Sequence, residues 1–98
     1  MQNKNLLSLL DASKSSIAPD NTDFNDVLGG TVYATVSTSN PLHLPDNVDK
    51  GGLVYTIRVS CSYPDYRMQV YFPAYNFPYI RYRYYYNNGW VWSDWKAM

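Results

Sequence analysis

The sequence predicts a mainly β protein, namely a small antiparallel β-sandwich or open barrel with a short N-terminal helix. Three observations lead to this fold class. All eight acidic residues are aspartate, which favours turns, and the chain has no glutamate, which favours helices. Aromatic residues, which favour strands, make up 17% of the chain. Short runs of alternating apolar and polar residues are separated by groups of Gly, Pro, Asn and Asp, within a length of 98 residues that suits one small domain.

The N-terminal helix is expected over residues 4–14. Leu6, Leu10 and Ile17 recur at the spacing of one helix face. A helix of this length depends for its stability on the surface against which it packs. Two interpretations remain open at this point: a terminal helix that lies on the domain, or the foot of a parallel trimeric stalk.

A linker is expected to follow the helix. Residues 15–21 are rich in Ser and include a proline, so we assign residues 1–21 to the helix and linker and residues 22–98 to a β domain. At the start of that domain, residues 22–28 suit one capped helical or 3-10 turn, which the Gly-Gly pair after it would end.

Alternation of apolar and polar residues then predicts three strands: residues 31–37, 52–60 and 66–72. The segments around these strands are rich in Pro, Gly, Asn or Asp, and we expect them to be loops: residues 38–52, 62–65 and 73–78. The spacing of these strands is typical of an antiparallel sandwich or open barrel.

The C-terminal twenty residues predict a β-hairpin. Two aromatic runs flank Asn88-Gly89, and both residues can adopt the positive φ of a two-residue type I′ turn. With this pair as the loop, Tyr85 faces Trp92 and Tyr84 faces Ser93.

The first arm of this hairpin has two different faces. Tyr79, Arg81, Arg83 and Tyr85 alternate with Ile80, Tyr82, Tyr84 and Tyr86. We expect the Ile/Tyr face to be in the core, because an Arg head group needs water or a partner. Trp92 is expected on the Arg face, where a guanidinium can stack over its indole.

The residue types give no sign of catalysis or of a cofactor. His43 and Cys61 are the single histidine and the single cysteine, so no set of metal ligands and no intrachain disulfide can be written. No nucleophile-elbow motif or phosphate-binding glycine loop is present. We therefore expect a protein that is not an enzyme and that has no cofactor.

The arginines that alternate with aromatic residues indicate a binding surface instead. Tyr and Trp rings can stack on the apolar face of a sugar, while Arg, Asn and Asp bind its hydroxyl groups. The candidate glycan-binding residues are Tyr75, Tyr79, Arg81, Arg83, Tyr85, Trp90 and Trp92. Two alternatives remain: rings that are core or subunit interface, and rings that stack on nucleic-acid bases. The second would call for a basic groove, and eight acids balance eight bases in this chain.

The C-terminal pattern also resembles a known family. A Tyr-Ile-Arg-Tyr-Arg strand from Tyr79, the Asn-Gly turn, and Trp-Ser-Asp-Trp-Lys from Trp92 are similar to the end of the knob domain of R-type pyocin tail fibres and of phage tail-fibre heads. Weaker similarities lie at Thr22–Asp26, Thr31–Tyr33, Asn40-Pro41, Gly51–Tyr55 and Met68–Tyr71. The resemblance thus covers residues 22–98, with two additional residues on each side of the turn.

This resemblance implies a function. It implies that residues 22–98 are the knob-like head of a homotrimeric tail fibre, at the fibre tip of a virion, which adheres to host cell-surface polysaccharide. Separately, the balanced charge leads us to expect no nucleic-acid partner, and the lack of a long apolar run leads us to expect no insertion into a membrane. Trp95 would be structural, as part of the Trp-Ser-x-Trp closure. The alternative function is a carbohydrate-binding module of a secreted bacterial protein.

Overall fold

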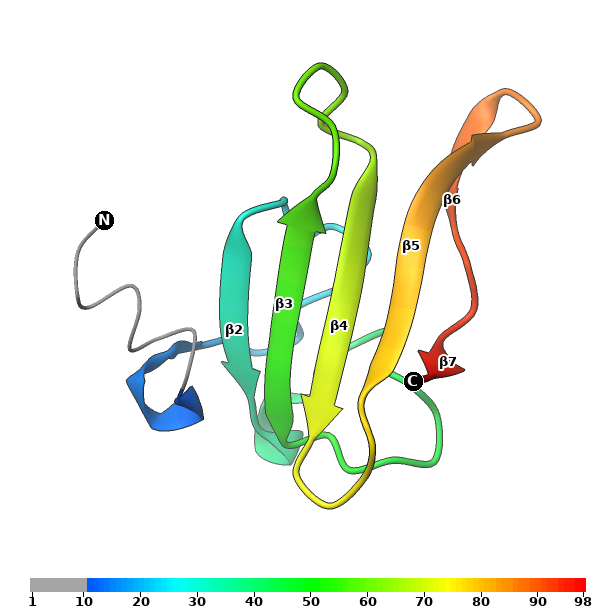
Figure 1. The fold of residues 1–98 in the computed structure, drawn as a ribbon. Helices are drawn as coiled ribbons and strands as arrows, with labels where there is room; N and C mark the ends of the chain where they lie inside the picture. The colour runs from blue at the N-terminus through cyan, green and yellow to red at the C-terminus, as the bar shows by residue number, and fades with distance from the viewer. Residues whose placement is uncertain (1–10) are drawn as a thin grey trace.

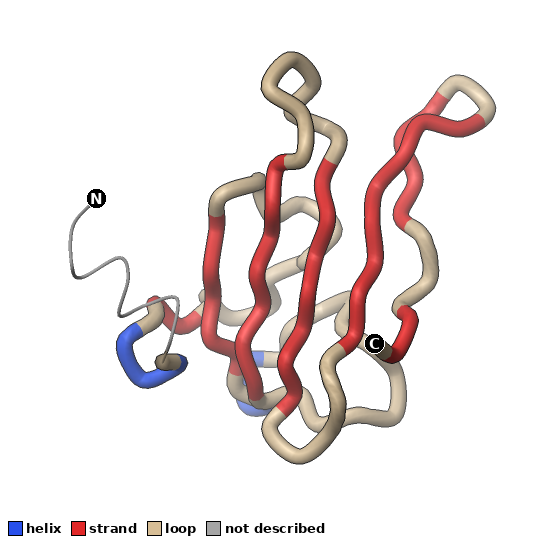
Figure 2. Tube along the Cα trace, in the orientation of Figure 1, coloured by secondary structure: helices blue, strands red, loops and turns tan. Residues whose placement is uncertain are grey.

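The computed structural model describes residues 11–98, which form one open mixed β-sheet (Figures 1 and 2). The strands are β1 (Ser16–Ile17), β2 (Thr31–Thr35), β3 (Gly52–Arg58), β4 (Arg67–Pro73), β5 (Tyr79–Tyr86), β6 (Gly89–Trp92) and β7 (Lys96–Ala97), and two 3-10 turns are η1 (Ala12–Lys14) and η2 (Ser37–Ser39). The sheet order is β1-β2-β3-β4-β5-β6, and β7 also pairs with β5. The prediction of a mainly β fold is confirmed.

The N-terminal part differs from expectation where it is described. The helix expected over residues 4–14 lies largely outside the described residues, and its last part forms only η1, which the Asp11 side chain caps. Ser16 and Ile17, expected in a linker, form β1 parallel to β2. The buried Ala18 fixes this strand, because its N–H donates to the carbonyl of Ala34 at 2.9 Å.

Residues 22–28 form no helix, but they contain one capped turn of the 3-10 type, as expected. The Asp26 N–H donates to the Asp23 carbonyl at 3.0 Å, and the Asp23 side chain accepts the N–H of Asn25 at 2.9 Å. The neighbouring backbone pairs with the loop after η2, where Phe24 donates to Leu42 at 3.1 Å. The segment is thereby extended over one face of the sheet.

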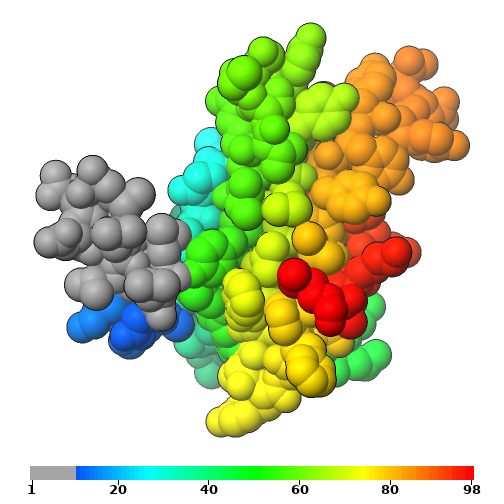
Figure 3. Space-filling model, viewed as in Figure 1, coloured from blue at the N-terminus to red at the C-terminus, as the bar shows by residue number. Residues whose placement is uncertain are grey.

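The two faces of the sheet differ in what covers them. Loops from residues 18–28 and 41–50 pack on one face, behind the strands in Figure 1, and enclose a core of Ala18, Phe24, Val27, Leu44, Val54 and Tyr71. We call the opposite side the open face. It carries Leu53, Tyr55 and Ile57 of β3, Met68, Val70 and Phe72 of β4, and Ile80, Tyr82 and Tyr84 of β5. No described residue forms a layer over it (Figure 3).

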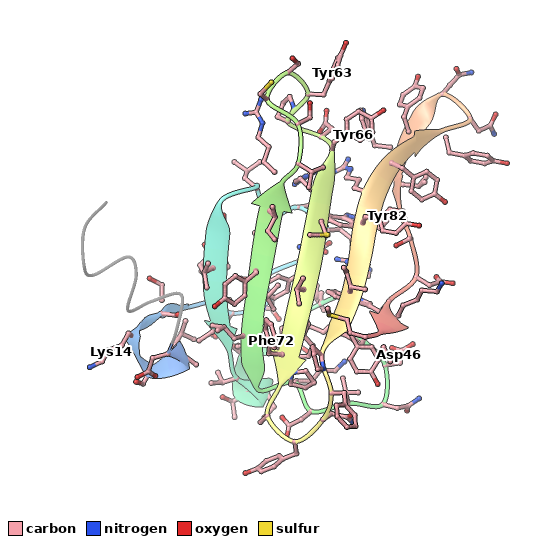
Figure 4. The ribbon with its side chains drawn as sticks, in the orientation of Figure 1. Lys14, Asp46, Tyr63, Tyr66, Phe72 and Tyr82 are labelled. Carbon is pink, nitrogen blue, oxygen red and sulfur yellow. The ribbon has the colours of Figure 1, made fainter. Side chains whose placement is uncertain are left out.

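The expected faces of β5 are reversed. Arg81 is 5% exposed and belongs to the covered face, whereas Tyr82, expected in the core, is 55% exposed on the open face (Figure 4). The Ile/Tyr face was therefore the wrong choice for the core. The reason is that the covering loops pack on the other side, where Arg81 finds partners that alternation alone does not reveal.

The hairpin turn lies one residue earlier than predicted. Asn87 and Asn88 have φ of 52° and 64°, as a type I′ turn requires, and Gly89 pairs with Tyr86. The expected Asn88-Gly89 loop was wrong, because asparagine also tolerates positive φ. The change displaces the partner strand by two residues, so every side chain keeps its face, and Trp92 lies opposite Arg83.

Candidate functional site

An open hollow of about 620 Å³ lies on the covered side of the molecule. Residues 41–46 and Lys50 form one wall, Tyr79 and Arg81 of β5 contribute from the sheet, and residues 92–95 form the other wall, with Asn25 at one end. We call this feature the hollow. Its walls come from segments that are distant in sequence.

The path of the C-terminal segment creates the second wall. β6 pairs with the second half of β5 and β7 with its beginning, so residues 93–95 leave the sheet between the two strands. Ser93 keeps this segment attached to β5, since its N–H donates to the Tyr82 carbonyl at 2.8 Å and its Oγ accepts the Tyr82 N–H at 3.0 Å. Trp92 and Trp95 are thereby brought to the same arginine.

The guanidinium of Arg81 lies in contact with both indoles. Its central carbon is 4.2 Å from the ring centroid of Trp92 and 4.6 Å from that of Trp95. Each such contact stabilises a desolvated cation by about 2 kcal/mol. Arg81 Nε also donates to Gln69 Oε1 at 2.8 Å. The expectation that a guanidinium stacks on Trp92 is confirmed.

Both indoles are held in place by the covering loops. Trp92 Nε1 donates to the Asn25 carbonyl at 3.1 Å, and Trp95 Nε1 donates to the His43 carbonyl at 2.9 Å. Trp95 also packs against the core beside Tyr71, in the structural role expected of it. Rings fixed in this way provide preorganised surfaces for a ligand.

A hydrogen bond between two side chains joins the loop beside the hollow to Asp23. His43 Nδ1 lies 2.6 Å from Asp23 Oδ1, and His43 has a positive φ of 66°. Burial alone would raise the pKa of Asp23, but hydrogen bonds from Asn25 and His43 and the charges of His43 and Arg81 outweigh it and lower this pKa below its ordinary value. Asp23 is thus held as a carboxylate.

Burial lowers the pKa of Arg81, whereas it acts to raise that of Asp23. It lowers the pKa of Arg81 to about 10, although the charge of Asp23 acts against this change. The side chain therefore remains a cation near neutral pH. The hollow accordingly contains a positive charge that is largely removed from water.

The structure brings together some of the predicted site residues. Tyr79, Arg81 and Trp92 line the hollow. Tyr85 and Trp90 instead contact each other farther along the hairpin, with their ring centroids 5.4 Å apart.

The two remaining candidates lie elsewhere. Arg83 lies between the hollow and the hairpin tip, where it pairs with Trp92. Tyr75, which is 90% exposed, belongs to the loop that precedes β5, and this loop and the hairpin tip lie at opposite ends of that strand (Figure 1). The candidates therefore do not form one continuous patch.

The wall formed by residues 41–46 was not predicted as part of a site. The separation between His43 and Trp95 is 52 residues, and no local pattern connects them. The alternation around Arg81 gave the only sequence signal for this place. Its arginine and indoles suit the binding of a ligand with an apolar face and polar edges.

Comparisons of the chain with models of protein families, with curated proteins and with solved structures find no match. Within residues 11–98, no three His, Cys, Asp or Glu side chains are grouped so that they could hold a metal ion. The same residues include no helix that is long and apolar enough to cross a membrane.

Proposed function

We propose that this protein is an adhesion domain that binds host cell-surface glycans, as the receptor-binding head of a phage tail fibre. The observation that carries the proposal is the hollow, in which two anchored indoles adjoin an arginine. The C–H face of a pyranose can pack on an indole, while the hydroxyl groups bond to polar groups at the rim. Asp46, Asp94 and Lys50 supply such groups.

The open face supports the assembly that a fibre head requires. Its side chains form one continuous apolar surface across β3, β4 and β5, with Phe72 44% exposed and in edge contact with Tyr55 at 5.6 Å. An exposed apolar surface of this kind is typical of subunit interfaces. Burial between copies of the chain in a homotrimer would cover it, whereas a free-standing carbohydrate-binding module would leave it in water.

The glycan-binding role is tested with a pair of matched variants. Tyr79→Ala removes a ring from the hollow, and Tyr75→Ala removes a fully exposed ring from the loop before β5. We expect Tyr79→Ala to weaken binding to host cells and to a glycan array about tenfold or more, and Tyr75→Ala to leave it unchanged.

Thermal unfolding of both alanine variants shows whether weaker binding comes from a lost ligand contact or from a less stable fold. Tyr79→Phe retains the ring, so it should bind like the parent. Equal loss in the Tyr75 and Tyr79 variants would place the site outside the hollow. A parent protein that binds no glycan and no host cell would remove the proposed function altogether.

A further inference from the structure

Three arginines share the covered face around one indole. In the register of β4 and β5, Gln69 pairs with Arg81 and Met68 with Tyr82, which brings Arg67 to the level of Arg83. Trp92 pairs with Arg83, and its ring lies 4.2 Å from the Arg81 guanidinium and 5.8 Å from that of Arg67. Two guanidinium groups therefore lie over the Trp92 ring, and a third arginine is its partner in the sheet.

Each of these arginines has a buried nitrogen without a hydrogen-bond partner among the described residues. The atoms are Arg67 Nε, Arg81 Nη2 and Arg83 Nε. A buried donor that stays unpaired costs about 1–3 kcal/mol, and more when it is charged. The fold therefore carries an excess of donors at this place.

The acceptors nearby do not match these donors. Arg81 Nε donates to Gln69 Oε1, and Arg67 Nη1 donates to the Val27 carbonyl at 2.6 Å. Asp65 lies 3.9 Å from Arg67 and is the one described carboxylate within ion-pair distance of the three arginines. In the same region a single buried acceptor, Asn25 Oδ1, has no partner among the described residues.

Of these three arginines, Arg81 lines the hollow, together with Trp92 and Asn25. A carboxylate is planar and offers several acceptor sites, so it matches the guanidinium fork. The rim sets a limit on ligand charge, because it carries two carboxylates, those of Asp46 and Asp94, and one ammonium, that of Lys50. This balance favours a ligand with one isolated negative charge over a polyanion.

We propose that the hollow binds a sugar that carries a carboxylate, such as a uronic acid flanked by neutral sugars. The carboxylate is received by Arg81, and the pyranose ring packs against the indole of Trp92 or Trp95. This inference rests on the proposed glycan-binding function and adds the chemical class of the ligand.

The experiment compares matched ligands on the full chain. Isothermal titration calorimetry measures the affinity for a panel of oligosaccharides with one uronic acid, each beside its carboxyl-reduced form, and for neutral and sulfated oligosaccharides. We expect at least one uronic acid ligand to bind about tenfold or more tightly than its reduced form. Its binding should also weaken with salt.

The outcomes separate the two proposals. Equal affinity for acidic and reduced forms overturns the carboxylate inference and leaves glycan binding in place. A preference for sulfated ligands over every carboxylated one also overturns it. Failure to bind any oligosaccharide, neutral or acidic, overturns both proposals.

Two sets of variants locate the carboxylate. Arg81→Lys keeps the charge but loses the planar fork, and it should lose about tenfold affinity for the acidic ligand and little for the reduced one. In case Arg81→Lys does not fold, Asp46→Asn combined with Asp94→Asn removes two exposed rim charges and should raise affinity for the acidic ligand several-fold. Asp20→Asn, exposed and outside the hollow, is the control. An unchanged affinity in the rim variant overturns the assignment.

Discussion

At position 81 the covered face of the sheet buries a guanidinium where an apolar side chain would be expected. Gln69, which is fully buried, receives one N–H of Arg81, and Gln69 in turn donates to the Phe24 carbonyl at 2.7 Å. The indoles of Trp92 and Trp95 replace part of the lost hydration of the cation. A partnered arginine is thus acceptable in the interior of this small domain.

The sequence allowed part of this arrangement to be predicted. Alternation correctly put Arg81, Arg83, Tyr85 and Trp92 on one face, because strand periodicity is local. It could not indicate which face is buried, because that depends on where residues 18–28 and 41–50 pack. Arginine usually faces water, but Arg81 is buried because Gln69, Trp92 and Trp95, which are distant from it in sequence, provide partners.

Asp23 should make the free energy of unfolding depend on pH in the acidic range. Its pKa in the folded state lies below the ordinary value of 3.8, so its contribution is complete above that pH and is lost as the pH falls through the folded pKa. We expect Asp23→Asn to be less stable than the parent near about pH 6, with the difference shrinking towards about pH 2.

Urea unfolding across this pH range measures the effect. Asp20→Asn, which alters an exposed aspartate, is the control and should run parallel to the parent. A difference between Asp23→Asn and the parent that stays constant with pH would mean that the carboxylate makes no net contribution through its charge.

At the level of the elements, the strands were the most predictable part. The runs at residues 31–37, 52–60 and 66–72 contain β2, β3 and most of β4, because each has a clear alternation bounded by turn residues. The hairpin was predicted as an element but not in its register. Asn87-Asn88 and Asn88-Gly89 can both form a type I′ turn, and the local sequence does not distinguish them; the observed register brings Trp92 to the Asn25 carbonyl.

Substitutions at Asn88 and at Gly89 can show which two residues form the turn. Asn88→Val forces a β-branched residue into positive φ and should lower the free energy of unfolding by about 1 kcal/mol or more. Gly89→Val should be tolerated better, because Gly89 has no positive φ and an added Cβ would meet only the Tyr86 carbonyl at 4.0 Å.

Chemical denaturation of both variants and of Asn88→Gly checks this order. Asn88→Gly should unfold at the same denaturant concentration as the parent, because glycine adopts positive φ without strain. If Gly89→Val is the more harmful change, the loop is Asn88-Gly89 after all.

At the level of the whole molecule, we propose that association takes place through the open face. Phe72, near the end of β4, and Tyr82, farther along β5, both belong to this face (Figure 4). We expect the parent to form a trimer and Phe72→Lys to be a monomer, because a charge buried between copies would have to be desolvated. Multi-angle light scattering at about micromolar to tens of micromolar concentration measures the masses.

The control for this experiment is Tyr75→Lys, which adds the same charge on a loop outside the open face. It should retain the mass of the parent. A parent protein that is monomeric over the whole concentration range would contradict the proposed assembly, and the free-standing module would then be the better description.

The anchoring of the covering loops by Trp92 and Trp95 also has a consequence for synthesis on the ribosome. These two hydrogen bonds span 67 and 52 residues, so the loops that they fix are translated long before their anchors. A nascent chain that ends at Val91 contains strands β2 to β5 but lacks both Trp92 and Trp95. Its covering loops still bond to Arg67, Gln69 and Tyr71 of β4 but are held less firmly than in the full chain, so the core that they enclose is completed only when the last residues are made.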